Sequence, residues 1–179
     1  MGALATPMVG DYLNRHFVSA FQKVATFQLN GGQKQGGNVA SYFCTPDGRV
    51  LHAIAGPVDA GTFLREARWA HETLQLAQLE NRSPAQLQAF FRKAHLERLQ
   101  LEQPLVIPEK RLPAPDRVTA KVLDELFVLN RHLPVSNQGK VHLLLAVGPM
   151  PPLEHVYRVV FEEILGERIS THPVRVAGR

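Results

Sequence analysis

The chain has 179 residues, 45% of them hydrophobic, which is enough for one good core with a modest appendage. Its 20 basic and 16 acidic residues are interspersed, which disfavours the clustered basic face of a nucleic-acid-binding protein. No apolar run approaches the ~20 residues that a membrane helix needs. A single cysteine, Cys44, excludes an intramolecular disulfide and a multi-thiolate metal site. The first residues lack a signal-peptide pattern, so we take the cytoplasm as the default location.

The first part of the chain predicts a helix, a strand, a hairpin and a second helix. The first helix runs from Pro7 to His16, with Thr6 able to cap it. Residues 17–29, FVSAFQKVATFQL, are rich in aromatic and β-branched side chains that alternate loosely, as in a strand. NVASYFC and RVLHAIA flank TPDG, whose proline and glycine suit a tight turn, so a hairpin is predicted there. Asp59 then caps a helix whose apolar residues recur at intervals of three and four.

The middle of the chain predicts two more helices separated by a linker. A capping box formed by Ser83 and Gln86 begins a helix after a break near Asn81. Residues 103–115 hold four prolines, which cannot sit inside a helix or a central strand, so this segment is predicted as an extended linker. Asp116 is placed to cap the helix that follows.

The last part of the chain predicts a strand followed by a helix. Residues 140–147, KVHLLLAV, form an almost continuous apolar run and are predicted as a buried strand. The turn GPMPP leads to a helix from Leu153 to Leu165, which Gly166 ends. The remaining tail is predicted to hold one more short strand.

The stretches VGDYLNRHFV and YFCTPDGRVLHAIAGPVDAGTFLREAR, in this order, resemble the latter part of a thioredoxin-like domain over about residues 6–75. The resemblance implies an α/β fold. Active members of that family carry CxxC at the start of the first helix and a cis-proline ahead of the third strand. Here no cysteine precedes Cys44, and Val39 or Ala40 stands where the cis-proline would be. Thiol exchange by the family mechanism is therefore not expected.

The resemblance also implies that a central strand of the sheet is missing from this chain. Residues 17–29 and NVASYFC could close up and pair directly. Alternatively, Val141 to Val147 could enter the sheet as a strand, covered by the helix from Leu153, in a permuted arrangement within one chain or between two. A separate strand-helix unit is equally open. The fold class predicted is α/β, with an incomplete or permuted thioredoxin-like sheet: a core at 1–80, a helix and proline-rich linker at 81–115, and a helix-strand-helix unit at 116–179 that packs on the core.

Few side chains have the sequence context of a chemical site. Cys44 lies at a strand end without a neighbour that would lower its pKa, so we predict a small buried hydrophobe. The rival hypothesis is a single-thiol enzyme that uses Cys44, or an active site completed by a partner chain. The eight histidines include no HExxH motif and no pair at i, i+4 spacing. We place His52 and His142 in strands, in ordinary hydrogen-bonded roles, and expect no metal and no cofactor.

The function predicted is that of a redox-inactive interaction or scaffolding domain, which could belong to a larger protein. A protein partner or self-association is expected, with no membrane. Weak nucleic-acid binding through scattered Arg and Lys is a third, less favoured alternative. The candidate partner contacts are the two adjacent aromatics Phe90 and Phe91, of which at least one should face a second element or chain, and Met150 and Pro151 in the GPMPP turn. Trp69 is expected to join the core.

Overall fold

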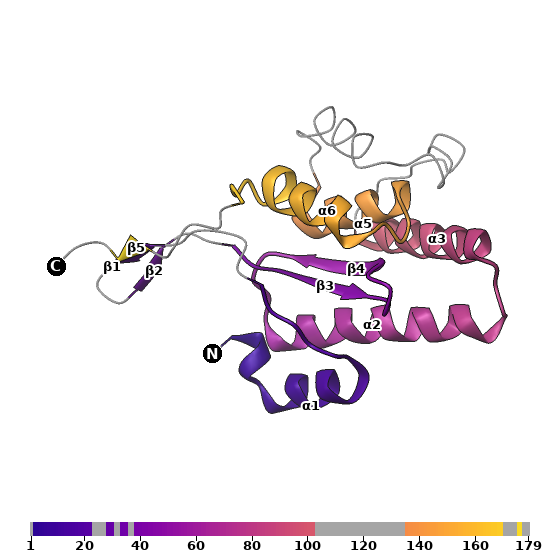
Figure 1. Ribbon diagram of the computed structural model, residues 1–179, viewed down its shortest axis with the longest axis horizontal. Coiled ribbons are helices and arrows are strands. Elements are labelled where there is room, and N and C mark those ends of the chain that lie inside the picture. Colours follow the sequence, from indigo (N-terminus) through magenta and orange to yellow (C-terminus); the bar gives the residue numbers. More distant parts are fainter. Residues whose placement is uncertain are drawn as a thin grey trace.

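A two-stranded antiparallel hairpin lies at the centre of the computed structural model, which describes residues 2–22, 28–30, 33–35, 38–102, 135–169 and 175–176 (Figure 1). Strand β3, Ala40–Cys44, pairs with β4, Val50–Ala55. Gly48 turns the chain between them with φ of 78°, and its N–H donates to the Thr45 carbonyl over 2.9 Å. The predicted hairpin is confirmed, because the TPDG turn supplies a glycine where a left-handed backbone is required.

Helices cover both sides of this hairpin (Figure 1). Helices α1 and α2 lie on one side, and α3, α5 and α6 lie on the other. Helix α6 continues directly into a π-helical turn, η4, and a short 3₁₀ turn, η1, precedes α1. The bounds are η1 Ala3–Ala5, α1 Pro7–His16, α2 Ala60–Leu79, α3 Pro84–Glu102, α5 Asn137–Val147, α6 Leu153–Val159 and η4 Val160–Ile164.

Helix ends follow the capping chemistry of the sequence, with one exception. The Asp59 side chain accepts from the Thr62 N–H over 2.9 Å at the start of α2. The Ser83 N–H donates to Gln86 over 2.8 Å at the start of α3, as in a capping box. Asn81, between these helices, has φ of 46° and marks the predicted break. Thr6 occupies the N-cap position of α1, but its side chain makes no capping hydrogen bond there.

The prediction of a buried strand at Val141 to Val147 is wrong, because these residues belong to α5. The helix begins at a cap, since the Ser136 hydroxyl accepts from the Gly139 N–H over 2.9 Å. All seven residues from 141 to 147 are buried. A helix that is covered all round shows no polar face, so its sequence carries no 3.6-residue period to distinguish it from a buried strand. The permuted strand proposed for the missing sheet position is therefore absent.

The predicted strand at residues 17–29 is wrong over residues 17–22, whereas residues 23–27 lie outside the described part of the chain and Gln28 and Leu29 do lie in a strand. Residues 17–22 are not in a strand, and Val18 and Phe21 are almost fully exposed, so their alternation meets no core. Strand β1, Gln28–Asn30, instead pairs antiparallel with β2 and parallel with β5 in a second sheet. Two ways of filling the missing strand position were predicted, pairing of residues 17–29 with β3 and entry of residues 141–147 as a strand. Neither is found among the described strands, because β3 pairs with β4 alone. The bounds of the two partners are β2 Gln33–Gln35 and β5 Arg175–Val176.

The predicted helix near the end of the chain and the short strand in the tail are both found. Helix α6 and η4 together run from Leu153 to Ile164, and Gly166 follows with φ of 67°. The predicted linker at 103–115 and the helix capped by Asp116 lie outside the described residues.

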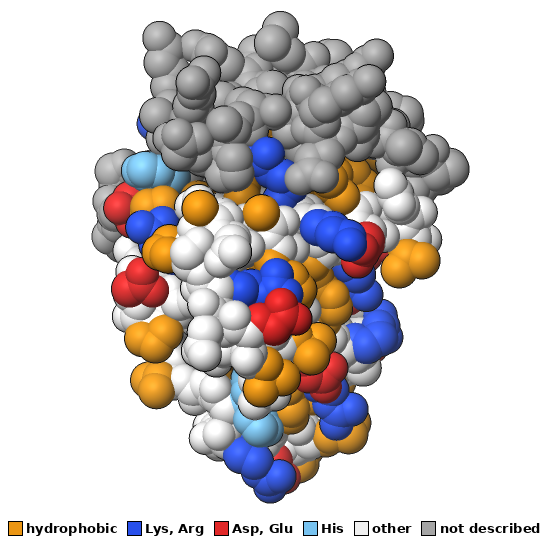
Figure 2. Space-filling model, turned by 90° about the vertical axis from the view of Figure 1, so that its right-hand side faces the viewer, with side chains coloured by type: hydrophobic (Ala, Val, Ile, Leu, Met, Phe, Trp, Pro, Cys, Tyr) orange, Lys and Arg blue, Asp and Glu red, His pale blue; other side chains and the backbone are white. Residues whose placement is uncertain are grey.

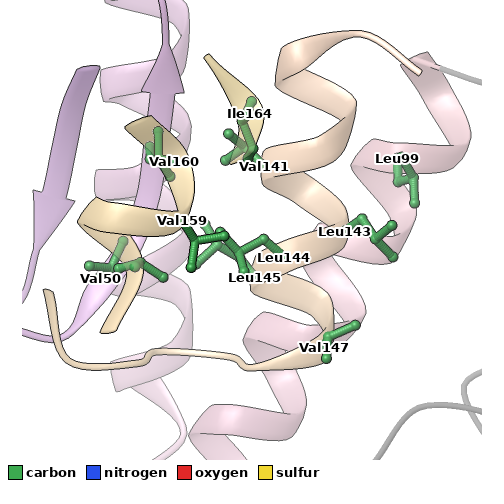
Figure 3. Packing of buried hydrophobic residues seen from close by; sticks show 12 residues of the cluster. Val50, Leu99, Val141, Leu143, Leu144, Leu145, Val147, Val159, Val160 and Ile164 are labelled. Atoms are coloured by element: carbon green, nitrogen blue, oxygen red, sulfur yellow. The ribbon is translucent and has the colours of Figure 1, made fainter. Parts of the chain in front are cut away.

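The largest buried cluster of the described residues lies where α5, α6 and η4 cover β4 (Figure 3). We call it the apolar cluster. In Figure 3 the side chains of Leu144, Leu145 and Val159 lie beside one another between the helices. Its members are Val50, Ala53, Leu99, Val141, Leu143, Leu144, Leu145, Val147, Val156, Val159, Val160 and Ile164.

The surface at the end of the molecule seen in Figure 2 mixes Lys and Arg with Asp and Glu, as the interspersed sequence charges predict. Within the described residues, no helix is both long and apolar enough to cross a membrane.

Candidate metal centre

Three buried histidines from distant parts of the chain meet beside the apolar cluster. His52 comes from β4, His95 from α3 and His142 from α5, and each side chain is at most 1% exposed. One ring nitrogen from each lies within 4.8 Å of the other two, and no other group in the described part of the chain has this potential to hold a metal ion. We call these three residues the histidine cluster.

The three histidine rings come together because α2, α3, α5 and β4 pack against one another. Helix α5 packs against both α3 and β4, so it carries its histidine to the other two. Trp69 on α2 forms a wall beside the rings, with its centroid 4.8 Å from that of His52 and 5.0 Å from that of His95. The prediction that Trp69 joins the core agrees with these contacts.

The Nε2 atoms of the three rings point to groups around the cluster. The Nε2 of His52 lies 3.0 Å from a carboxylate oxygen of Glu66. The Nε2 of His95 lies 2.9 Å from the Leu51 carbonyl, to which it donates. The Nε2 of His142 lies 3.5 Å from a Glu102 oxygen and makes no hydrogen bond. Two carboxylates and one carbonyl therefore surround the rings.

Arg98 ties the two carboxylates together. One of its terminal nitrogens lies 2.7 Å from both oxygens of Glu66 and 3.7 Å from Glu102. Its guanidinium also lies over the Trp69 ring, 5.5 Å from the centroid. A buried carboxylate needs such a partner, because an unpaired charge away from water is costly.

The electrostatics keep the ring of His52 neutral and Glu66 ionised. Burial lowers the pKa of His52 to about 4. Burial of Glu66 favours its protonated form, but His52 and Arg98 outweigh it and lower the pKa of Glu66 to about 2. Burial lowers the pKa of His95 well below its ordinary value as well. Neutral imidazole is the form of histidine that binds a metal ion.

The Nε2 atoms of His52 and His95 already have hydrogen-bond partners. The Nδ1 atoms are therefore the nitrogens of these rings that are available as ligands for an ion. The Nδ1 of His95 and the Nδ1 of His142 lie 2.9 Å apart and share one hydrogen bond. The Nδ1 of His52 is buried and has no hydrogen-bond partner. Buried polar atoms are nearly always paired, so an unpaired ring nitrogen beside two others indicates a group that the protein itself does not supply.

This donor set suits a transition-metal ion of the zinc class. Imidazole nitrogens bind Zn²⁺ at about 2.0–2.1 Å, which places tetrahedral ligands roughly 3.3 Å apart. In the structure one ring nitrogen of each histidine lies within 4.8 Å of the other two, and the Nδ1 atoms of His95 and His142 lie 2.9 Å apart, so the separations are of the order that one such ion requires. Calcium and magnesium take oxygen ligands and do not fit three nitrogens.

Among the residues that the structure describes, Cys44 has no neighbour that would activate its thiol. The side chain is partly buried and packs against the apolar cluster. Burial raises the pKa of the Cys44 thiol to about 11, so it is almost entirely protonated near neutral pH. This agrees with the prediction of a small hydrophobe and gives no support to the single-thiol alternative.

Of the four predicted partner contacts, Phe90 alone reaches the surface to any extent. Phe91 and Met150 are buried together with Leu51 and Ala77, and Pro151 is buried as well. Phe90 is half-buried and lines a shallow groove of about 550 Å³. The guanidinium of Arg82 covers its ring at 4.2 Å. The GPMPP turn is therefore closed against the chain itself and is not open to a partner.

Comparison with known proteins adds no relative, since no protein-family model, no curated protein and no solved structure matches this chain.

Sequence reasoning missed the histidine cluster because its members have no regular spacing. His95 and His142, which share the hydrogen bond, are 47 residues apart. One signal was available, since His52 and His142 each interrupt an apolar run, in VLHAIA and KVHLLLAV. A histidine inside a fully buried element must find partners for both of its ring nitrogens.

Proposed function

We propose that this chain is a metal-binding domain in which His52, His95 and His142 hold one divalent transition-metal ion of the zinc class. The observation that carries the proposal is the arrangement of the outer ring nitrogens. Metal-bound histidines almost always direct the second nitrogen to a carboxylate, a backbone carbonyl or water. Glu66, Leu51 and Glu102 occupy these three places.

The ion would cross-link elements that are far apart in the sequence. It would join β4, α3 and α5, each of which supplies one ligand. Because the unfolded chain holds no preformed site, the free energy of metal binding adds to that of folding.

The test is zinc binding by protein that has been stripped with a chelator. Competition against a chromogenic chelator should give one Zn²⁺ per chain in the wild type, and Co²⁺ should give the visible absorption of a bound ion. His95→Gln should abolish stoichiometric binding. His155→Gln, which changes a histidine on α6 outside the cluster, is the matched control and should bind as the wild type does.

The proposal is wrong if the stripped wild type binds no zinc, or if the two variants behave alike. Circular dichroism of the stripped variants separates loss of the site from loss of the fold. Should His95→Gln fail to fold, His52→Gln takes its place, since the Nδ1 of His52 makes no hydrogen bond in the structure and the hydrogen-bond contacts at risk are those of its Nε2 with Glu66 and Gln138.

A scaffolding role in a redox-inactive thioredoxin-like domain remains a second candidate. Its specific support is β3, which pairs with one strand only among those described and so leaves a strand edge that another chain could extend. Native mass spectrometry at micromolar concentration tests it. A dimer or a stable complex supports this candidate, and a strictly monomeric chain that takes up no strand peptide contradicts it.

A further inference from the structure

The histidine cluster is closed to solvent, so an ion can reach it only when a side chain beside it moves. Its three members are at most 1% exposed. A metal site needs an entry path as well as ligands, because the ion arrives from water. The side chain that blocks this path therefore determines how fast the ion enters and leaves.

Trp69 on α2 borders all three rings of the cluster. Its ring centroid lies 4.8 Å from that of His52, 5.0 Å from that of His95 and 5.8 Å from that of His142, at interplanar angles of 67°, 62° and 89°. Such edge-to-face contacts are typical of closely packed aromatic rings. Movement of this one side chain would therefore uncover the whole cluster.

Glu102 and Gln138 also reach solvent beside the cluster, but each contacts a smaller part of it. The contact of Glu102 is with His142, and that of Gln138 is with His52. The Gln138 amide is further held by the Ala53 carbonyl, to which it donates over 2.9 Å. Trp69 is thus the better candidate for the entry path of an ion that binds all three rings.

Trp69 lies at the boundary between the buried and the exposed faces of α2. Glu66, three residues earlier, and Ala70, the next residue, are buried, whereas Arg65 and Arg68 are exposed. Trp69 itself is partly buried. A side chain at such a boundary can turn toward water by a change of rotamer that leaves the helix intact.

Arg98 on α3 holds the Trp69 ring in its closed position. The guanidinium carbon lies 5.5 Å from the ring centroid, within the range of a cation–π contact. One terminal nitrogen lies 2.7 Å from both carboxylate oxygens of Glu66, which fixes the guanidinium in place. Opening must break the contact with Arg98 as well as those with the histidine rings, so it has a barrier.

We infer that Trp69 is the gate of the metal site, and that an ion enters and leaves when the indole ring swings away from the histidine cluster. The inference rests on the proposed function. Indole offers no lone pair to a metal ion, so Trp69 is not a ligand. A group that only blocks the path slows entry and exit by the same factor. Trp69 should therefore control the rate of metal exchange and leave the affinity nearly unchanged.

Stopped-flow mixing of the stripped full chain with Co²⁺ tests the gate, with the visible absorption of the bound ion as the signal. Trp69→Ala should raise the association rate constant by about tenfold or more, which corresponds to a barrier lower by about 1.4 kcal/mol. Release of Co²⁺ to an excess of chelator should accelerate by a similar factor. Phe90→Ala is the matched control, since Phe90 is a partly buried aromatic under Arg82 in a groove whose described lining includes no histidine, and both rates should stay unchanged.

The dependence on Co²⁺ concentration separates a gate from a merely structural role. If opening of the ring precedes binding, the observed rate in the wild type should level off at high Co²⁺, whereas in Trp69→Ala it should keep rising. A merely structural role would speed release alone, because loosened ligands hold the ion less tightly but are no easier to reach.

The inference is overturned if Trp69→Ala binds Co²⁺ no faster than Phe90→Ala does. Should Trp69→Ala fail to fold, Trp69→Phe takes its place, because its smaller ring should still speed association, and a rate equal to that of the wild type contradicts the gate. A wild type that binds no Co²⁺ at all would instead overturn the proposed function itself.

Discussion

Helix α5 contributes to two buried clusters that differ in how complete they are. In the apolar cluster, Leu144 and Leu145 are at most 1% exposed and need nothing beyond their neighbours (Figure 3). In the histidine cluster, His142 is equally buried but has a nitrogen without a hydrogen bond. Apolar side chains are satisfied by packing alone, whereas buried polar atoms require specific partners. The apolar cluster therefore explains the stability of the fold, and the histidine cluster points to a ligand.

The largest expected effect is on the apolar cluster. Leu144→Ala removes a fully buried side chain and should lower the free energy of unfolding by about 2–5 kcal/mol, because it loses transfer free energy and leaves a cavity. Leu101→Ala is the control, since Leu101 is 82% exposed and should change stability little. Urea titration of both variants measures the difference. Equal midpoints would show that α5 is not part of the core.

Zinc should stabilise the protein through the histidine cluster alone. At a free zinc concentration of 100 times the dissociation constant, the free energy of unfolding should rise by about 2.7 kcal/mol. Ile164→Val, which trims the apolar cluster on η4, should keep this increment, whereas His95→Gln should lose it. Thermal denaturation with and without zinc provides the measurement. An increment that survives in His95→Gln would place the ion elsewhere.

A smaller effect is expected where α2 begins. Asp59→Ala removes the side chain that caps α2, the helix that holds Glu66 and Trp69 beside the histidines. The loss should be about 1 kcal/mol in the free energy of unfolding. Asp11→Ala, at an exposed position within α1, has no cap to lose and should be neutral or slightly stabilising. Indistinguishable variants would contradict the capping assignment.

The smallest effect is expected at Cys44, which packs on the edge of the apolar cluster. With a pKa of about 11, roughly one thiol in 10⁴ is ionised at pH 7, so iodoacetamide should modify native protein slowly. The rate should rise as pH increases toward 11 and should reach that of a free thiol after unfolding. Rapid selective alkylation at pH 7 would reinstate a reactive cysteine.

Local sequence predicted the parts of the fold that local chemistry decides. The TPDG hairpin, the Asp59 cap, and the helices beginning at Pro7 and Pro84 agree with the structure because each depends on a few adjacent residues. The two wrong strand predictions have opposite causes. Val18 and Phe21 are exposed and cover no core, whereas α5 is covered so completely that its period disappears.

The candidate site could not be predicted in the same way. His52 and His142 were visible as polar residues inside apolar runs, but His95 lies on a helix in a stretch rich in charge. Only the packing of α5 against both α3 and β4 brings the three rings together. The same packing places the outer partners. It brings the Glu66 carboxylate to the Nε2 of His52 and the Leu51 carbonyl to the Nε2 of His95.

By itself, the sequence determined where the hairpin turns, where most helices begin, and that one cysteine allows neither an intramolecular disulfide nor a dithiol site within this chain. These properties depend on backbone preferences and residue counts that neighbouring residues fix. The tertiary structure alone decided that residues 141–147 are helical and that three histidines share one buried space. The physical reason is that burial and the matching of polar atoms depend on which distant elements meet, and no local pattern encodes that meeting.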